Sequence, residues 1–169
     1  IILHELDADN ISGIDEGTMF IHPFIMNEAD DKLLFIPTLK RLWRSVNSGD
    51  NWQPISRYYD GTSYYWVSIA TGRTADPVVY FANNDSLFVM PSAATATPGT
   101  ELGMTAPVIA EKMYTDFNND SVLFMLKKNL PSAIYKSSNM LLGNIQWSIL
   151  NFPSDLTPIS LTTYPGNSN

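Results

Sequence analysis

A short pattern recurs three times along this chain at intervals of about 45 residues. Each copy is an aspartate in a polar turn, followed by a run of apolar, strand-forming residues. The three aspartates are Asp31, Asp76 and Asp120, which lie 45 and then 44 residues apart. A period of this length indicates one supersecondary unit per repeat, since such units bury their apolar faces only against their neighbours. The chain is therefore expected to consist of stacked repeats.

The residues around each aspartate predict a meander of short strands. Apolar runs follow the aspartates at 33–36, 78–81 and 122–125, and further runs come next at 42–45, 87–90 and 134–137. Strand-like runs also precede the aspartates, at 19–24, 65–70 and 107–113, and 148–150 is predicted as a last strand. A strand and turn meander with this period is typical of the four-stranded blade of a β-propeller.

We therefore predict an all-β fold with almost no helix: a β-propeller segment of about three four-stranded blades, incomplete at both ends. The approximate repeats are 17–60, 61–105 and 106–155, and 156–169 is expected to start a further blade. A complete β-sandwich with accidental periodicity is the alternative. Because three blades leave unpaired sheet edges, we expect these residues to belong to a longer polypeptide or to pair with chains that complete the ring.

Composition narrows the classes of partner and compartment. The net charge of -7 opposes phosphate binding, so no nucleic acid partner is expected. No apolar run approaches the roughly 18 residues needed to span a bilayer, and no transmembrane segment is predicted. Cysteine is absent, which excludes disulfides and thiolate zinc sites but is compatible with export. A secreted or cell-surface location is expected, with the bacterial outer surface and the periplasm left open.

One hairpin carries a recognisable motif. It begins at Ser45, continues through Asn47 and Gly49, and ends at Trp52. This stretch resembles the Asp-box, the Ser-x-Asp-x-Gly-x-Thr-Trp hairpin of BNR-repeat propellers, with Asn47 in place of the aspartate and Asn51 in place of the threonine. We expect Asn47 to bond backbone amides, Gly49 to adopt positive φ and Trp52 to wedge its indole between sheets.

The BNR-repeat family includes sialidases, xyloglucanases, sortilin-type receptors and photosystem assembly factors. In that family the hairpin is structural and lies away from the central pocket, so the resemblance implies a fold more than a chemistry. The third repeat contains a degenerate copy of this motif, formed by residues 137–139 and, after an insertion, 143–147. The second repeat lacks it, and its residues 91–100 are predicted to form an extended loop.

A glycosidase would need two carboxylates facing each other across a sugar. Glu111 is the candidate catalytic acid because it interrupts a predicted strand, although an outward-facing strand residue explains it about as well. Sialidase activity is not expected, because the arginines fall outside any sialidase motif. Arg44 and Lys136 occupy equivalent repeat positions, which predicts a solvated strand face.

Metal and cofactor sites are not expected. His4 and His22 are the only histidines, too few for a transition-metal site, and the Asp116–Asp120 turn is interpreted as an ordinary Asx-rich turn rather than a calcium site. Tyr58 and Tyr59 lie in an inter-blade connection and are candidate ligand contacts, whereas Trp66 is predicted to be core.

Three functions remain open on these grounds. The leading interpretation is a noncatalytic propeller scaffold that binds protein or glycan in an exported or cell-surface protein. The alternative is a glycoside hydrolase of the xyloglucanase kind, with part of its active site outside this segment. A third is an assembly subunit that completes its propeller with blades from the same or another chain.

Overall fold

The computed structural model describes residues 24–59, 68–83, 86–127, 133–141, 145–151 and 160–163. These residues form twelve short strands and no helix. The strands are β1 Ile25–Met26, β2 Leu34–Pro37, β3 Leu42–Ser45, β4 Gln53–Pro54, β5 Ser68–Thr71, β6 Val79–Ala82, β7 Leu87–Met90, β8 Leu102–Met104, β9 Lys112–Thr115, β10 Leu123–Lys127, β11 Ala133–Ser137 and β12 Trp147–Leu150.

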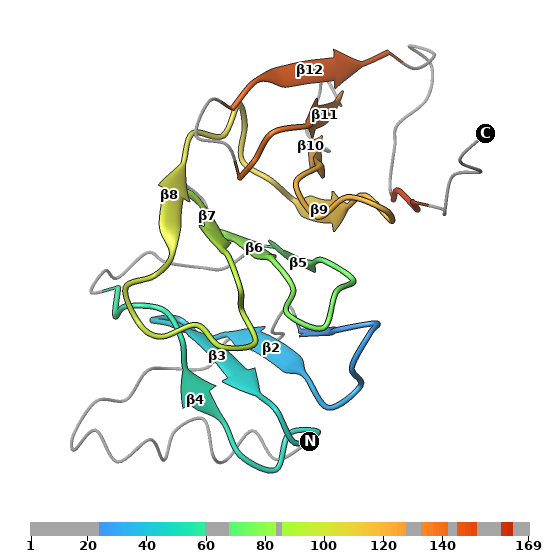
Figure 1. Cartoon of the computed structure of the whole chain (residues 1–169). Helices are drawn as coiled ribbons and strands as arrows, with labels where there is room; N and C mark the ends of the chain where they lie inside the picture. Colours follow the sequence, from blue (N-terminus) through green and yellow to red (C-terminus); the bar gives the residue numbers. More distant parts are fainter. Residues whose placement is uncertain are drawn as a thin grey trace.

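The strands form three antiparallel sheets of four, each joined in sequence order as an up-and-down meander. We name them blade 1 (β1 to β4), blade 2 (β5 to β8) and blade 3 (β9 to β12). The first strands lie side by side, since β1 contacts β5 and β5 contacts β9. The last strands, β4, β8 and β12, lie at the opposite edges of their sheets (Figure 1). This arrangement is that of successive propeller blades, and the predicted all-β fold is confirmed.

The predicted period of the repeat is reflected in equivalent backbone bonds. Asn27, Gly72 and Asp116 follow the first strand of their blades, 45 and 44 residues apart, and each donates its N–H to the residue before the second strand. The acceptors are the carbonyls of Leu33, Val78 and Val122, at 2.9, 2.8 and 3.0 Å. Each blade therefore begins with the same closed turn.

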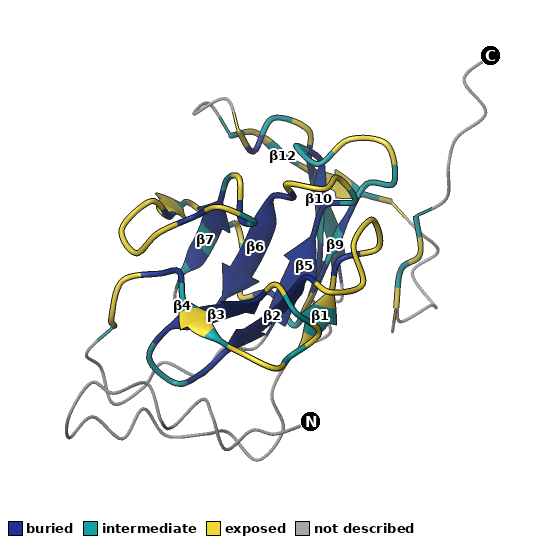
Figure 2. Ribbon diagram, turned by 60° about the horizontal axis from the view of Figure 1, so that its bottom comes forward, coloured by how far each residue is buried: buried dark blue, intermediate teal, exposed yellow. Residues whose placement is uncertain are grey.

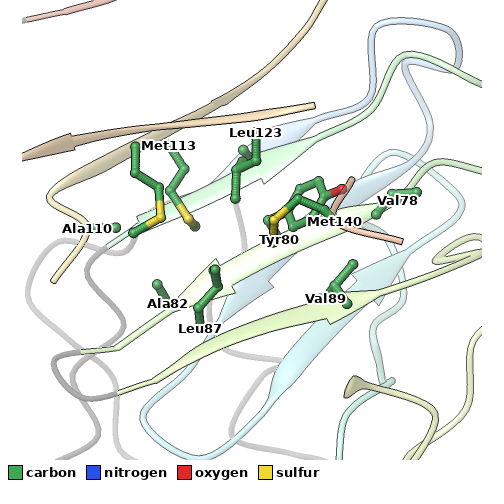
Figure 3. Close-up of a cluster of buried hydrophobic side chains, with 11 residues drawn as sticks. Val78, Tyr80, Ala82, Leu87, Val89, Ala110, Met113, Leu123 and Met140 are labelled. Atoms are coloured by element: carbon green, nitrogen blue, oxygen red, sulfur yellow. The ribbon is translucent and has the colours of Figure 1, made fainter. Parts of the chain in front are cut away.

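Apolar side chains fill both spaces between blades. Between blades 1 and 2, Phe35 and Leu42 pack on Val79, Phe81 and other buried residues of the same cluster. Between blades 2 and 3, Tyr80 and Leu87 face Met113 and Leu123, and Met140 lies beside Tyr80 (Figure 3). Because alternate residues of a strand point to opposite faces, β6 supplies both interfaces. The buried residues accordingly run along the inner strands, while exposed ones gather in the turns and on the outer strands β4, β8 and β12 (Figure 2).

Several predicted strand bounds need correction. The first predicted strand, 19–24, lies outside the described residues except for Phe24, and β1 follows directly at Ile25. Residues 65–67 of the second predicted strand also lie outside the described residues. They include Trp66, so its predicted place in the core is not described. Residues 107–111 are not a strand. They connect the outer strand β8 to the inner strand β9, and Pro107 cannot donate to a ladder.

The loop 91–100 was predicted to be extended and is instead a series of turns. Its Ala93 and Ala96 are buried in the interface between blades 1 and 2. There, Arg44 donates from Nη1 to the Ala93 carbonyl at 2.8 Å and to the Ala96 carbonyl at 3.4 Å. Arg44 is only 6% exposed, so the prediction of a solvated strand face is wrong for this residue. Burial lowers the pKa of Arg44, and nearby Asp76 offsets part of that effect.

Candidate functional site

The hairpin between β3 and β4 is held by the side chains of Ser45 and Asn47. Ser45 Oγ donates to Asn47 Oδ1 at 2.9 Å and accepts the Gly49 N–H at 2.9 Å. Asn47 Oδ1 also accepts the Asn51 N–H at 2.9 Å. Gly49 has a φ of +94°, a conformation that L side chains rarely adopt. These bonds close the turn.

Trp52 completes the hairpin by donating its indole N–H to the Gly49 carbonyl at 3.0 Å. Its ring packs against Ile36 and Trp43, which belong to the same blade. These contacts lie within blade 1, and the expected wedge between two sheets stays a prediction. The hairpin of blade 3 repeats the amide contact, since Asn139 Oδ1 accepts the Gln146 N–H at 3.1 Å, but Trp147 donates to the Thr105 carbonyl instead.

Glu101 is the buried acceptor of a polar cluster between blades 1 and 2, whose Arg57 side chain is exposed. It is 1% exposed, and its Oε1 accepts Arg57 Nε at 2.6 Å, the Arg57 backbone N–H at 3.0 Å and the Tyr59 hydroxyl at 3.1 Å. Its Oε2 accepts the Gly99 N–H at 2.9 Å. Burial alone raises the pKa of Glu101, but these donors outweigh it and hold the pKa below its usual range. Glu101 is an ionised structural carboxylate.

Tyr58 and Tyr59, the two candidate ligand contacts, lie in and beside this cluster. Tyr59 is half-buried, bonded to Glu101 and tilted against Phe88 with ring centroids 5.1 Å apart. Tyr58 is 37% exposed and lies near two cations, Arg41 at 5.3 Å and Lys40 at 5.6 Å from its ring center. Of the two candidate ligand contacts, Tyr58 has a ring that is partly exposed to solvent, whereas Tyr59 contacts residues of the neighbouring blade.

Glu111 does not interrupt a strand. It is a half-buried residue immediately before β9, and its backbone N–H donates to the Leu126 carbonyl at 3.1 Å. The sequence placed Glu111 inside a strand because the apolar residues before it, 107–110, have the composition of a strand. In the structure the inner strand β9 begins only after Glu111.

A central cavity of about 270 Å³ lies among the first strands of the three blades and the segment 161–163. Its lining residues are Ile25, Met26, Glu28, Ala70, Thr71, Arg73, Met113, Tyr114, Thr115, Leu161, Thr162 and Thr163. The charged lining residues are one pair, because Arg73 Nε donates to Glu28 Oε2 at 2.5 Å. Sequence reasoning missed Glu28 and Arg73, although their 45-residue separation marks them as equivalent positions of two blades.

Arg73 is held from several directions at the rim of the central cavity. Its Nη1 donates to Thr163 Oγ1 at 3.2 Å, and its guanidinium lies 4.6 Å from the ring center of Phe117. Glu28, Arg73 and Phe117 occupy the same position in the three blades, so this rim is a row of equivalent residues. Such a row can contact one partner that lies across several blades.

A second cavity, of about 310 Å³, lies at the end of β6 and the beginning of β7, beside the connection 106–110. Its lining is apolar apart from Asn83 and Ser86, and it contains no charged residue. Within the described ranges, no group of three or more histidine, aspartate and glutamate side chains could hold a metal ion. The same ranges contain no helix long and apolar enough to cross a membrane.

No protein-family profile and no curated protein sequence matches this chain. Solved structures do match. An ancestral GH74 enzyme superposes with a TM-score of 0.52 at 13% identity, over 78% of this chain and 19% of that enzyme. YCF48, solved bound to D1 peptide, superposes with a TM-score of 0.53 at 12% identity, over 79% of this chain and 45% of YCF48. The chain thus spans less than half of either protein, and it has the fold of part of a β-propeller.

Proposed function

We propose that this chain is a noncatalytic propeller scaffold that binds a protein or glycan partner over its central cavity. The observation that carries the proposal is the charge of that cavity. Hydrolysis of a glycosidic bond needs two carboxylates about 5–10 Å apart, one of them held protonated. The described lining of the central cavity has a single carboxylate, Glu28, and that carboxylate is paired with Arg73.

Two other acids of the described blades, Glu101 and Asp120, fit the same interpretation. Glu101 is engaged by four donors between blades 1 and 2. Asp120 accepts the Arg73 N–H and the Thr74 hydroxyl, each at 3.2 Å, and so joins blade 3 to blade 2. Because these carboxylates serve as hydrogen-bond acceptors within the fold, they support a rigid scaffold rather than proton transfer.

A protein segment is the partner we favour. The lining combines thioether and aliphatic groups with threonine hydroxyls, a mixture that suits the side chains and backbone of a peptide. YCF48, which shares the fold, was solved with a peptide bound. We further propose that the protein acts outside the cytoplasm, either secreted or at the cell surface. Cell fractionation, with the protein detected by an antibody against blade 2, tests this location.

A glycoside hydrolase is the second candidate, because the other superposed propeller is a GH74 enzyme. In that case part of the active site lies outside these residues, and Glu111 is the acid to test. Its half-buried place at the entry to β9 is compatible with this role.

Two assays on the same purified protein separate the candidates. In the first, fluorescence anisotropy measures binding of a labelled D1 peptide and of xyloglucan oligosaccharides. Met26→Glu places a charge at the central cavity, where Met26 is 48% exposed, and Ile149→Glu is the control on the outer strand β12, where Ile149 is 59% exposed. We expect Met26→Glu to weaken binding about tenfold or more and Ile149→Glu to leave it unchanged.

The second assay follows release of reducing sugar from the same oligosaccharides. The scaffold proposal predicts no turnover by the wild-type protein. Turnover that is lost in Glu111→Gln would instead establish the hydrolase, and binding that is equally weakened by Ile149→Glu would place the partner away from the central cavity.

A further inference from the structure

Two sets of equivalent positions, one on the second strand and one on the third, are less buried in blade 3 than in blades 1 and 2. Phe35, Tyr80 and Phe124 lie 45 and 44 residues apart and occupy the same place in the second strand of their blades. Phe35 and Tyr80 are 0% exposed, whereas Phe124 is half-buried. The difference follows from packing, because the next blade covers Phe35 and Tyr80.

The third strands show the same difference. Leu42 and Leu87 are 0% exposed, but their equivalent in blade 3, Ile134, is half-buried. Phe124 lies opposite Lys136 on the neighbouring strand, just as Phe35 lies opposite Arg44. The face of blade 3 that points away from blade 2 therefore has the composition of a blade interface. We call it the outward face. Its half-buried members are Tyr114, Phe124, Ile134 and Lys136, and its members Val122 and Leu126 are already buried, at 7% and 2% exposed.

One described segment already occupies the place of a next blade. Thr115 Oγ1 of blade 3 donates to the Thr71 carbonyl of blade 2 at 2.7 Å. Thr163 Oγ1 repeats this bond one step along, donating to the Thr115 carbonyl at 3.0 Å. Leu161–Thr163 also complete the wall of the central cavity beside β9. This segment thus contacts β9 through the same kind of threonine hydroxyl bond by which β9 contacts β5.

We propose that the outward face of blade 3 is the docking surface of a fourth four-stranded blade, and that Leu161–Thr163 are its innermost strand. The same polypeptide supplies the rest of this blade, because blades 2 and 3 each begin with an inner strand that follows the outer strand of the blade before it. Leu161–Thr163 follow β12 in that same order.

The interface between blades 1 and 2 predicts how this fourth blade binds. Arg44 reaches the carbonyls of the loop after the third strand of the next blade. Its equivalent, Lys136, now lies 5.6 Å from the ring center of Phe124. In the docked state Lys136 is buried, and the carbonyls of the corresponding loop of the fourth blade accept its ammonium group.

Cysteine labelling tests the surface, because residues 1–169 contain no cysteine and the wild-type protein gives the background rate of labelling. Single variants Ile134→Cys, Leu42→Cys and Ile149→Cys are introduced into the protein at its natural length and reacted with a maleimide in native buffer. We expect Ile134→Cys to react at least about tenfold more slowly than the exposed Ile149→Cys and close to the buried Leu42→Cys. Equal rates for Ile134→Cys and Ile149→Cys would overturn the proposal.

The intact mass of the same preparation tests the source of the blade. A polypeptide heavier than 18.9 kDa by about 5 kDa or more, the mass of a blade of about 45 residues, is expected. Slow labelling that depends on a second, separable polypeptide would show that another chain supplies the blade and would contradict the proposal.

Hydrogen exchange gives a readout that does not depend on the cysteine variants. Thr163→Val removes the bond to Thr115 and should speed exchange of the amides in 161–163 by about tenfold, while the control Thr162→Val, at an exposed position, should not. Fast exchange of this segment in the wild-type protein would show that it is not a docked strand.

Discussion

Gly72 is the residue whose replacement the structure resists most directly. A Cβ added there would coincide with the carboxylate of Asp120, which comes from the next blade. That carboxylate bonds the Arg73 N–H and the Thr74 hydroxyl, so it cannot move without losing both. The absence of a side chain at Gly72 therefore determines how closely blade 3 approaches blade 2.

We predict that Gly72→Ala lowers the free energy of unfolding by about 1–3 kcal/mol, the usual cost of overpacking. Gly103→Ala is the matched control, because nothing lies within 4 Å of its added Cβ, and it should change stability by less than about 0.5 kcal/mol. Urea unfolding followed by tryptophan fluorescence measures both. Equal effects of the two substitutions would contradict the close packing of Asp120 on Gly72.

At the scale of an element, the β3–β4 hairpin depends on one side-chain oxygen. Asn47 Oδ1 accepts from the Ser45 hydroxyl and from the Asn51 N–H, both at 2.9 Å. An aspartate offers the same acceptor oxygen, so the geometry of this turn accommodates either residue at position 47.

Asn47→Ala is expected to destabilise the protein by about 1–2 kcal/mol, because two donors of the turn lose their acceptor. Asn47→Asp should leave stability within about 0.5 kcal/mol of the wild-type value at neutral pH. Thermal unfolding of the three proteins provides the measurement. If alanine were tolerated as well as aspartate, the hairpin would be held by Trp52 and Gly49 rather than by Asn47.

At the scale of the whole molecule, Glu101 makes the join between blades 1 and 2 sensitive to pH. Its pKa in the folded protein is held below the unfolded value. Glu101 therefore stabilises the fold above about pH 4.5, and this contribution is lost as the pH falls through the lowered pKa.

We predict that Glu101→Gln destabilises the chain at pH 7 and that the difference from wild type shrinks as the pH falls below about 4.5. Urea unfolding of both proteins between pH 7 and pH 3 measures this difference, in which the titration of all other carboxylates cancels. A difference that stayed constant over the range would mean that Glu101 contributes packing and not charge.

Much of the fold could be predicted because it repeats locally. The 45-residue period and the alternation of strand and turn placed β3 and β7 at their observed bounds and anticipated most of the others. The short strands β4 and β8 were not anticipated. Strand β4 has only two residues, and Leu102–Met104 of β8 contains a glycine and no β-branched residue. Residues 107–111 were assigned to a strand because their composition does not reveal that they cross from one sheet to the next.

The sequence by itself determined the repeat, the class of fold and the hairpin motif, because each depends on residues that are neighbours in the chain. Tertiary structure alone decided what the side chains meet. Arg44 and Lys136 are equivalent in the repeat, yet Arg44 is buried because the loop of the next blade covers it. Glu101 meets Arg57 from 44 residues away, and Arg73 meets Glu28 from 45. These pairings arise when one blade stacks on the next, and no local pattern in either segment specifies its partner.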